Sequence, residues 1–143
     1  MRYLAATDGS DESDRAVQYA STQAVAFDAT IEIVHALEFE AKLIDGEIVL
    51  PGGEKSTELG NQTLEQAREL AVRVVEESDS DVSVETQLLT GRPADAITDR
   101  AREIGADAIY VGHRGRSEES EQAVGSVAKS VVDKATVPVT VLR

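Results

Sequence analysis

The sequence has no cysteine, which excludes disulfide bonds and metal sites built from thiolates. It also has no apolar run of membrane-spanning length and no signal-peptide pattern at its start, so we expect a soluble cytoplasmic protein with no membrane partner. Aromatic residues make up only 3% of the chain. At 143 residues the chain has the length of one domain, 1–143, that buries a core without covalent or metal cross-links.

Positive charge is also scarce, because 14 basic residues stand against 27 acidic ones and the net charge is −13. Such a field repels a nucleic-acid backbone, so we do not expect a nucleic-acid partner. Since 41% of the residues are apolar and recur periodically, the acidity does not indicate disorder. A surface this acidic and poor in lysine is typical of a halophilic protein, with an ordinary acidic protein as the alternative.

Segments of strand character alternate regularly with segments of helical period. Residues 38–55 interrupt this rhythm, and Asp45 and Gly46 indicate a small hairpin there. The alternation predicts an α/β fold, with an open parallel five-stranded sheet and helices on both faces in the order βαβαβαβαβ. Pro138 removes a backbone donor, which places the last strand at an edge. The expected strands are 2–7, 30–37, 82–89, 106–112 and 137–142, and helices are expected over 11–27 and 56–78, from Pro93, and after Val124.

Two connections leave the carboxyl ends of strands, which is where open α/β sheets bind ligands. TDGS (7–10) follows the first strand, and GHRGRSEESEQAVGS (112–126) follows the fourth. If these strands are neighbours, the two connections face each other across a crevice. Glycines let main-chain amides approach an anion, and the start of a helix favours a phosphate. The alternative is that the glycines only turn the chain and that the serine before the last helix caps it.

The second connection has a specific spacing, in which Gly112, two residues, Gly115 and nine residues precede Gly125 and Ser126. The segments YLAATDGSDESDRAVQYA, GRPADAI, ADAIYVGHRGRS and GSVAKSVVDKATVPVTVLR follow in a matching order. Together they resemble the universal stress protein family, of the UspA-like, ATP-binding type, over essentially the whole chain. The resemblance implies a Rossmann-like domain that binds ATP and forms a homodimer through its last strand.

The resemblance also implies which residues hold the nucleotide. Asp8, with Thr7 and Gly9 beside it, would contact the ribose or the adenosine side, and the backbone at Ala36 and Leu37 would lie near the adenine. We expect main-chain amides in the second connection to hold the phosphates, an arginine to reach phosphate oxygens, and Mg²⁺ or Mn²⁺ to be a possible companion ion. The residues expected along the triphosphate are Gly112, His113, Arg114, Gly115, Arg116, Gly125, Ser126 and Val127.

Some residues depart from the family pattern. Ala128 stands where the family often has a second hydroxyl, and Glu118, Glu119 and Glu121 add negative charge to the loop unless they form a solvated surface. Glu12 lies in an acidic cluster that the dipole of the first helix would favour. His35 reads as a filler at the end of a strand.

The sequence contains no P-loop, no dinucleotide fingerprint after the first strand and no nucleophile elbow. We therefore predict no catalytic residue. The resemblance to the universal stress protein family implies a nucleotide-binding sensor or regulatory module in the stress response. Two alternatives remain open. One is a slow ATPase or nucleotide-transferring enzyme of the same fold, and the other is a dimeric interaction protein that binds no nucleotide.

Overall fold

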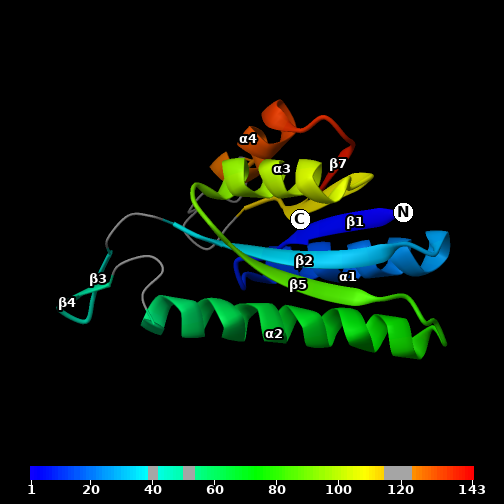
Figure 1. Cartoon of the computed structure of the whole chain (residues 1–143), viewed down its shortest axis with the longest axis horizontal. Helices are drawn as coiled ribbons and strands as arrows, with labels where there is room; N and C mark the ends of the chain where they lie inside the picture. Colours follow the sequence, from blue (N-terminus) through cyan, green and yellow to red (C-terminus); the bar gives the residue numbers. More distant parts are fainter. Residues whose placement is uncertain (39–41, 50–53, 115–123) are drawn as a thin grey trace.

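In the computed structural model, five strands form one parallel sheet with helices on both faces (Figure 1). The structure describes residues 1–38, 42–49, 54–114 and 124–143. The elements are β1 (Arg2–Ala6), α1 (Asp11–Phe27), β2 (Thr30–Leu37), β3 (Lys42–Ile44), β4 (Glu47–Val49), α2 (Glu54–Glu77), β5 (Val84–Thr90), α3 (Pro93–Ile104), β6 (Ala108–Gly112), α4 (Ser126–Lys134) and β7 (Val139–Leu142).

The strand order β5-β2-β1-β6-β7 places β1 at the centre of the sheet. β1 pairs in parallel with β2 on one side and with β6 on the other. From β1 the chain runs outward to β2 and then β5. The connection that contains α3 brings it back to β6 on the other side of β1, and β7 follows next to β6. The winding direction therefore reverses between β1 and β6. The predicted parallel fold and the pairing of the first strand with the fourth are confirmed. Pro138 immediately precedes β7, which is an edge strand as predicted.

The core consists of two apolar layers, one on each face of the sheet. Successive residues of a strand point to opposite faces, so Leu4 packs in one layer and Ala5 in the other. α1 and α2 cover the first face, where alanines such as Ala16 and Ala20 allow close approach. α3 and α4 cover the second. No described helix has the length and apolar character needed to span a membrane.

The segment between β2 and α2 contains a small antiparallel hairpin of β3 and β4. Asp45 and Gly46 form its two-residue turn, with φ angles of 51° and 80°. Both angles lie in the left-handed region that a type I′ turn requires and that Asp and Gly adopt readily. The predicted hairpin is confirmed.

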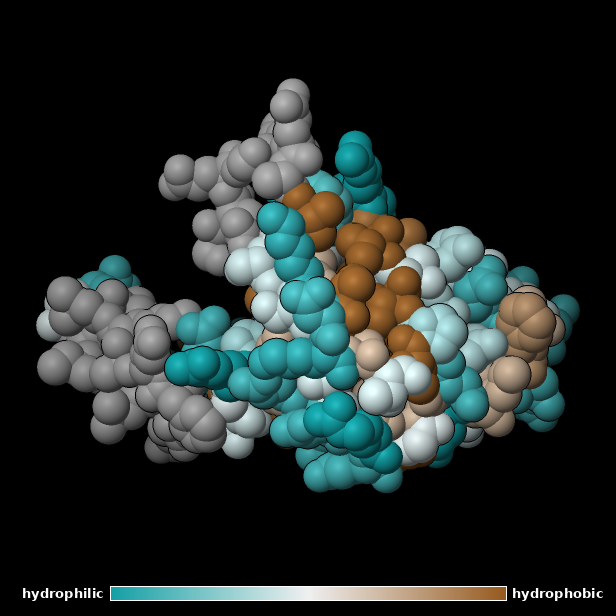
Figure 2. All heavy atoms as spheres, turned by 90° about the horizontal axis from the view of Figure 1, so that it is seen from above, coloured by the Kyte–Doolittle hydropathy of each residue, from teal (hydrophilic) through white to brown (hydrophobic). Residues whose placement is uncertain are grey.

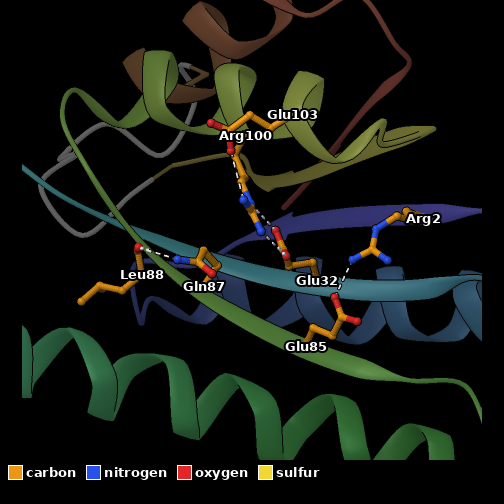
Figure 3. A network of polar contacts seen from close by, with 7 residues as sticks. All are labelled: Arg2, Glu32, Glu85, Gln87, Leu88, Arg100 and Glu103. Carbon is orange, nitrogen blue, oxygen red and sulfur yellow. Dashed lines mark hydrogen bonds and ion pairs between the residues drawn. The ribbon is translucent and has the colours of Figure 1, made fainter.

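A buried carboxylate interrupts the apolar face beneath α3. Glu32 of β2 is 3% exposed, and its two side-chain oxygens accept hydrogen bonds of 2.9 Å each from Arg100 of α3. Arg100 also donates to Glu103 at 3.0 Å (Figure 3). The hydrogen bonds to Glu32 raise the pKa of the Arg100 guanidinium above its ordinary value. This bidentate contact fixes α3 against the middle of β2.

Replacing Arg100 with Met should destabilise the protein by about 2 kcal/mol or more, because Glu32 would keep a buried charge without its partner. Arg102→Met is the matched control, since Arg102 lies on the same helix and its partner Asp99 is 67% exposed on the side chain. We expect the control to change stability by less than about 0.5 kcal/mol. Urea unfolding of both variants measures the difference, and equal stabilities would contradict this role of Arg100.

Candidate nucleotide-binding site

A cavity of about 310 Å³ opens at the carboxyl ends of the central strands. It lies where the winding reverses, between the connections that follow β1 and β6. This volume is at the lower end of the range for small-molecule pockets. The expected site residues that line it are Thr7, Asp8, Ala36, Leu37, Gly112, His113, Arg114, Gly125 and Val127. Gly9 and Ser126 lie next to lining residues without lining the cavity themselves, and Gly115, Arg116 and the three glutamates of the loop lie outside the described residues.

The turn after β1 is held by its own side chains. Thr7 Oγ1 accepts from the Gly9 amide at 3.1 Å and lies 3.1 Å from Ser13 Oγ. Asp8 Oδ1 accepts from the Ser10 amide at 3.0 Å, and the Ser10 hydroxyl caps α1 by accepting from Ser13 N at 3.2 Å. This short hydroxyl-rich segment therefore holds the Asp8 side chain in a defined position at the cavity.

The end of β2 presents backbone groups to the cavity. In a parallel ladder the N–H and C=O of one residue point to the same neighbouring strand, and those of the next residue point to the other. Val34 O accepts from Thr7 N on the β1 side at 2.9 Å, and Leu37 O accepts from Gly91 N on the β5 side at 2.8 Å. The groups of Ala36 therefore point to the β1 side, beyond the end of β1. Because Ala36 lines the cavity, its N–H and C=O face it.

Three amides of the second connection do not match our expectation that they would be available to phosphates. The His113 amide donates to Leu142 O at 2.5 Å, and the Gly125 amide donates to His113 O at 2.6 Å. The Arg114 amide donates to Glu12 Oε2 at 2.6 Å. These bonds hold the connection to β7 and α1, so a phosphate could use these amides only by displacing protein acceptors.

Two amides at the start of α4, those of Val127 and Ala128, have no acceptor in the part of the chain that the structure describes. Gly125 is the N-cap residue and has no side chain to accept from the first turn. The amides of Val127 and Ala128 find no acceptor among the described residues, and both residues line the cavity. The positive end of the helix dipole adds to the attraction for an anion. At the start of α4, unlike at His113 and Arg114, amides that line the cavity have no protein acceptor among the described residues.

Gly112 is required where the end of β6 approaches α1. A Cβ atom at this position would lie 2.9 Å from Ser13 N and 3.0 Å from the Glu12 carbonyl carbon. Because both neighbours are backbone atoms, a larger residue would separate β6 from the first turn of α1. The glycine thus serves the packing of the strand end as well as lining the cavity.

Glu12 and Arg114 form an ion pair beside this contact. Glu12 Oε1 accepts from Arg114 Nη2 at 2.6 Å, in addition to the bond from the Arg114 amide. Glu12 is 8% exposed. Burial alone would raise the pKa of Glu12, but the hydrogen bonds from the Arg114 amide and guanidinium bring it below the ordinary value.

Two further polar atoms near the cavity are buried without a partner among the described residues, namely His113 Nε2 and Arg114 Nε. No group of three or more His, Cys, Asp or Glu within the described ranges is arranged to hold a metal ion. The expectation of Mg²⁺ or Mn²⁺ therefore stays a prediction.

Comparison with known proteins decides the family. The universal stress protein family matches residues 1–143. The chain belongs to this family. A universal stress protein of Bacillus subtilis is 32% identical over 151 residues, covering 99% of this chain and 98% of the relative.

Solved structures of the family have the same fold. The Archaeoglobus fulgidus universal stress protein in complex with dAMP is 25% identical, with a TM-score of 0.75 and coverage of 100% of this chain and 98% of the other. A universal stress protein in complex with cAMP is also 25% identical, with a TM-score of 0.74 and coverage of 100% and 96%. Adenine nucleotides are thus ligands of similar universal stress proteins.

Sequence reasoning missed two side chains beside the cavity of this family member. His35 lines it, and because Thr7 O can only accept, His35 Nδ1 donates in their 2.8 Å contact. That hydrogen bond requires a proton on Nδ1 and leaves Nε2 as an acceptor in the neutral ring. Glu12 was assigned to the helix dipole, whereas it binds Arg114. The position of His35 at the end of a strand was the available signal for the first, but nothing in the sequence pairs Glu12 with Arg114.

Proposed function

We propose that this universal stress protein binds an adenine nucleotide in the cavity and acts as a sensor or regulatory module in the stress response. The observation that carries the proposal is that main-chain groups without a partner among the described residues belong to residues lining two sides of one cavity. Ala36 provides them at the end of β2, and Val127 and Ala128 provide them at the start of α4. The complexes of similar proteins with dAMP and cAMP support the same ligand class.

The adenine is assigned to the end of β2. One residue that offers both an N–H and a C=O matches the edge of adenine that carries a ring-nitrogen acceptor next to an amino donor. Ala36 and Leu37 also supply apolar surface for the ring. Asp8, held by Ser10, is in place to accept from a ribose hydroxyl.

The phosphates are assigned to the first turn of α4, where the amides of Val127 and Ala128 and the helix dipole favour an anion. ATP is the nucleotide that the resemblance to the ATP-binding type implies, and Gly115 and Arg116 stay predicted contacts. Rapid turnover is not part of the proposal. Glu12, the buried carboxylate beside the loop, is engaged by Arg114 and is poorly placed to accept a proton from water.

Replacing Ser126 with Asp should weaken AMP and ATP binding about tenfold or more, because it places a negative charge at the first position of α4. Ser126 is exposed, and a carboxylate at a helix N-terminus favours the helix, so the fold should persist. Ser130→Asp adds the same charge one turn later and should change affinity by less than about threefold. Calorimetric titration of the wild type and both variants measures these affinities.

The same titrations distinguish the alternatives. Equal affinities for the two variants would remove the start of α4 from the site. A wild-type chain that binds neither nucleotide at millimolar concentration, and releases none when denatured, would favour the interaction protein. A rate of ATP conversion to ADP that is proportional to the protein concentration would favour the slow enzyme.

We also propose that the chain forms a homodimer through β7. β7 is an edge strand, and apolar residues gather on the face that carries α4 and β7 (Figure 2). Val132 of α4 is 51% exposed. Ile109 N donates to Pro138 O and His113 N donates to Leu142 O. The intervening Val139 and Val141 therefore direct their N–H and C=O outward, where a second copy would pair.

Light scattering should give a mass of about twice the 15.3 kDa of one chain. Val141→Pro removes one outward N–H and leaves the ladder to β6 intact, so it should shift the protein toward the monomer while the far-ultraviolet spectrum is retained. A wild-type protein that is monomeric at about 100 micromolar would contradict pairing through β7.

A further inference from the structure

The contact between Glu12 and Arg114 occupies the donors that the second connection would otherwise offer to a ligand. Glu12 comes from the first turn of α1, and Arg114 is the second residue after β6 and lines the cavity. The amide and the guanidinium of Arg114 each donate to one oxygen of the Glu12 carboxylate, at 2.6 Å in both cases. This is how a main-chain amide and an arginine jointly bind a phosphoryl group.

The contact is fixed by its surroundings. Glu12 is 8% exposed as a residue and 11% exposed on its side chain, so little water competes for its carboxylate. A Cβ atom on Gly112 would lie 3.2 Å from Glu12 Cβ, which shows how closely the first turn of α1 packs on the end of β6. A ligand phosphate could reach both Arg114 donors only if the Glu12 side chain moved away, which would leave its charge without these partners.

We propose that Glu12 is a specificity-determining residue of the cavity, which withholds Arg114 from the ligand and so reduces the preference for nucleotides with several phosphates. This inference rests on the proposed function, since it concerns the same nucleotide. The first turn of α4 binds one phosphoryl group without involving Arg114. Each further phosphate must approach the negative charge of the Glu12 carboxylate. The Arg114 guanidinium, which would offset the charge of that phosphate, is already bound to Glu12.

The inference predicts how affinity varies along the series adenosine, AMP, ADP and ATP. Glu12→Gln removes the charge and one acceptor while preserving the size of the side chain. It should tighten ATP binding about tenfold, because the Arg114 guanidinium becomes available for a charge-assisted bond to phosphate. Adenosine should be affected by less than about twofold, with AMP and ADP between the two. Calorimetric titration of the four ligands gives the ratio of ATP to adenosine affinity directly.

Asp11→Asn is the matched control, since Asp11 lies in the same first turn, is exposed, and makes no contact with Arg114. It removes the same charge from the protein. If Asp11→Asn raised ATP affinity as much as Glu12→Gln, the cause would be the lower net negative charge of the protein rather than the release of Arg114, and the inference would be overturned. The double variant Glu12→Gln/Arg114→Gln should lose the gain, because the liberated guanidinium is absent. A double variant that keeps the gain would also overturn it.

Glu12→Ala is a second variant for the same measurement of the ATP-to-adenosine affinity ratio. Because alanine favours the helix in which Glu12 lies, this variant should fold, and the result does not depend on the folding of Glu12→Gln alone. A rise in the ATP-to-adenosine ratio in both Glu12 variants, absent in Asp11→Asn, supports the inference. An unchanged ratio in folded Glu12 variants overturns it even if the wild type binds all four ligands, in which case the proposed function stands. Failure of the wild type to bind any of the four overturns both.

Discussion

The parallel pairing of β1 with β6 is the constraint on which the site depends. It joins strands that are separated by three helical crossover connections along the chain, and it sets the carboxyl ends of both at the same place on the sheet edge. The turn after β1, the start of α1 and the start of α4 converge there as a result. None of these segments could form the cavity alone, because each contributes only one wall of it.

The groups around the cavity are divided between packing and recognition. Gly112, Glu12 and the amides of His113, Arg114 and Gly125 are engaged in joining β6 to α1 and β7. The backbone of Ala36 and the amides of Val127 and Ala128 have no such protein partner among the described residues. A buried polar group that has found a protein partner gains nothing further from a ligand unless that bond is broken. The proposed recognition of a ligand therefore relies on the backbone of Ala36, Val127 and Ala128.

The sequence was sufficient for the fold because local signals and the global arrangement agree. The periods of the segments, the Asp45-Gly46 turn and Pro138 each indicate an element that the structure contains. The general position of the site followed from strand alternation. Individual contacts did not, because the partner of Glu12 is 102 residues away in the sequence and depends on the close approach at Gly112. Glu32 was likewise unforeseen, since a single acidic residue in a strand does not reveal that Arg100 covers it.

The central claim is that main-chain groups at two ends of one cavity hold the two ends of a nucleotide. The most direct test is a titration with AMP followed by nuclear magnetic resonance of the ¹⁵N-labelled chain. The account predicts that the amide signals of Ala36, Val127 and Ala128 move most and saturate together. Saturable binding of AMP that leaves these three signals in place while others move would contradict it.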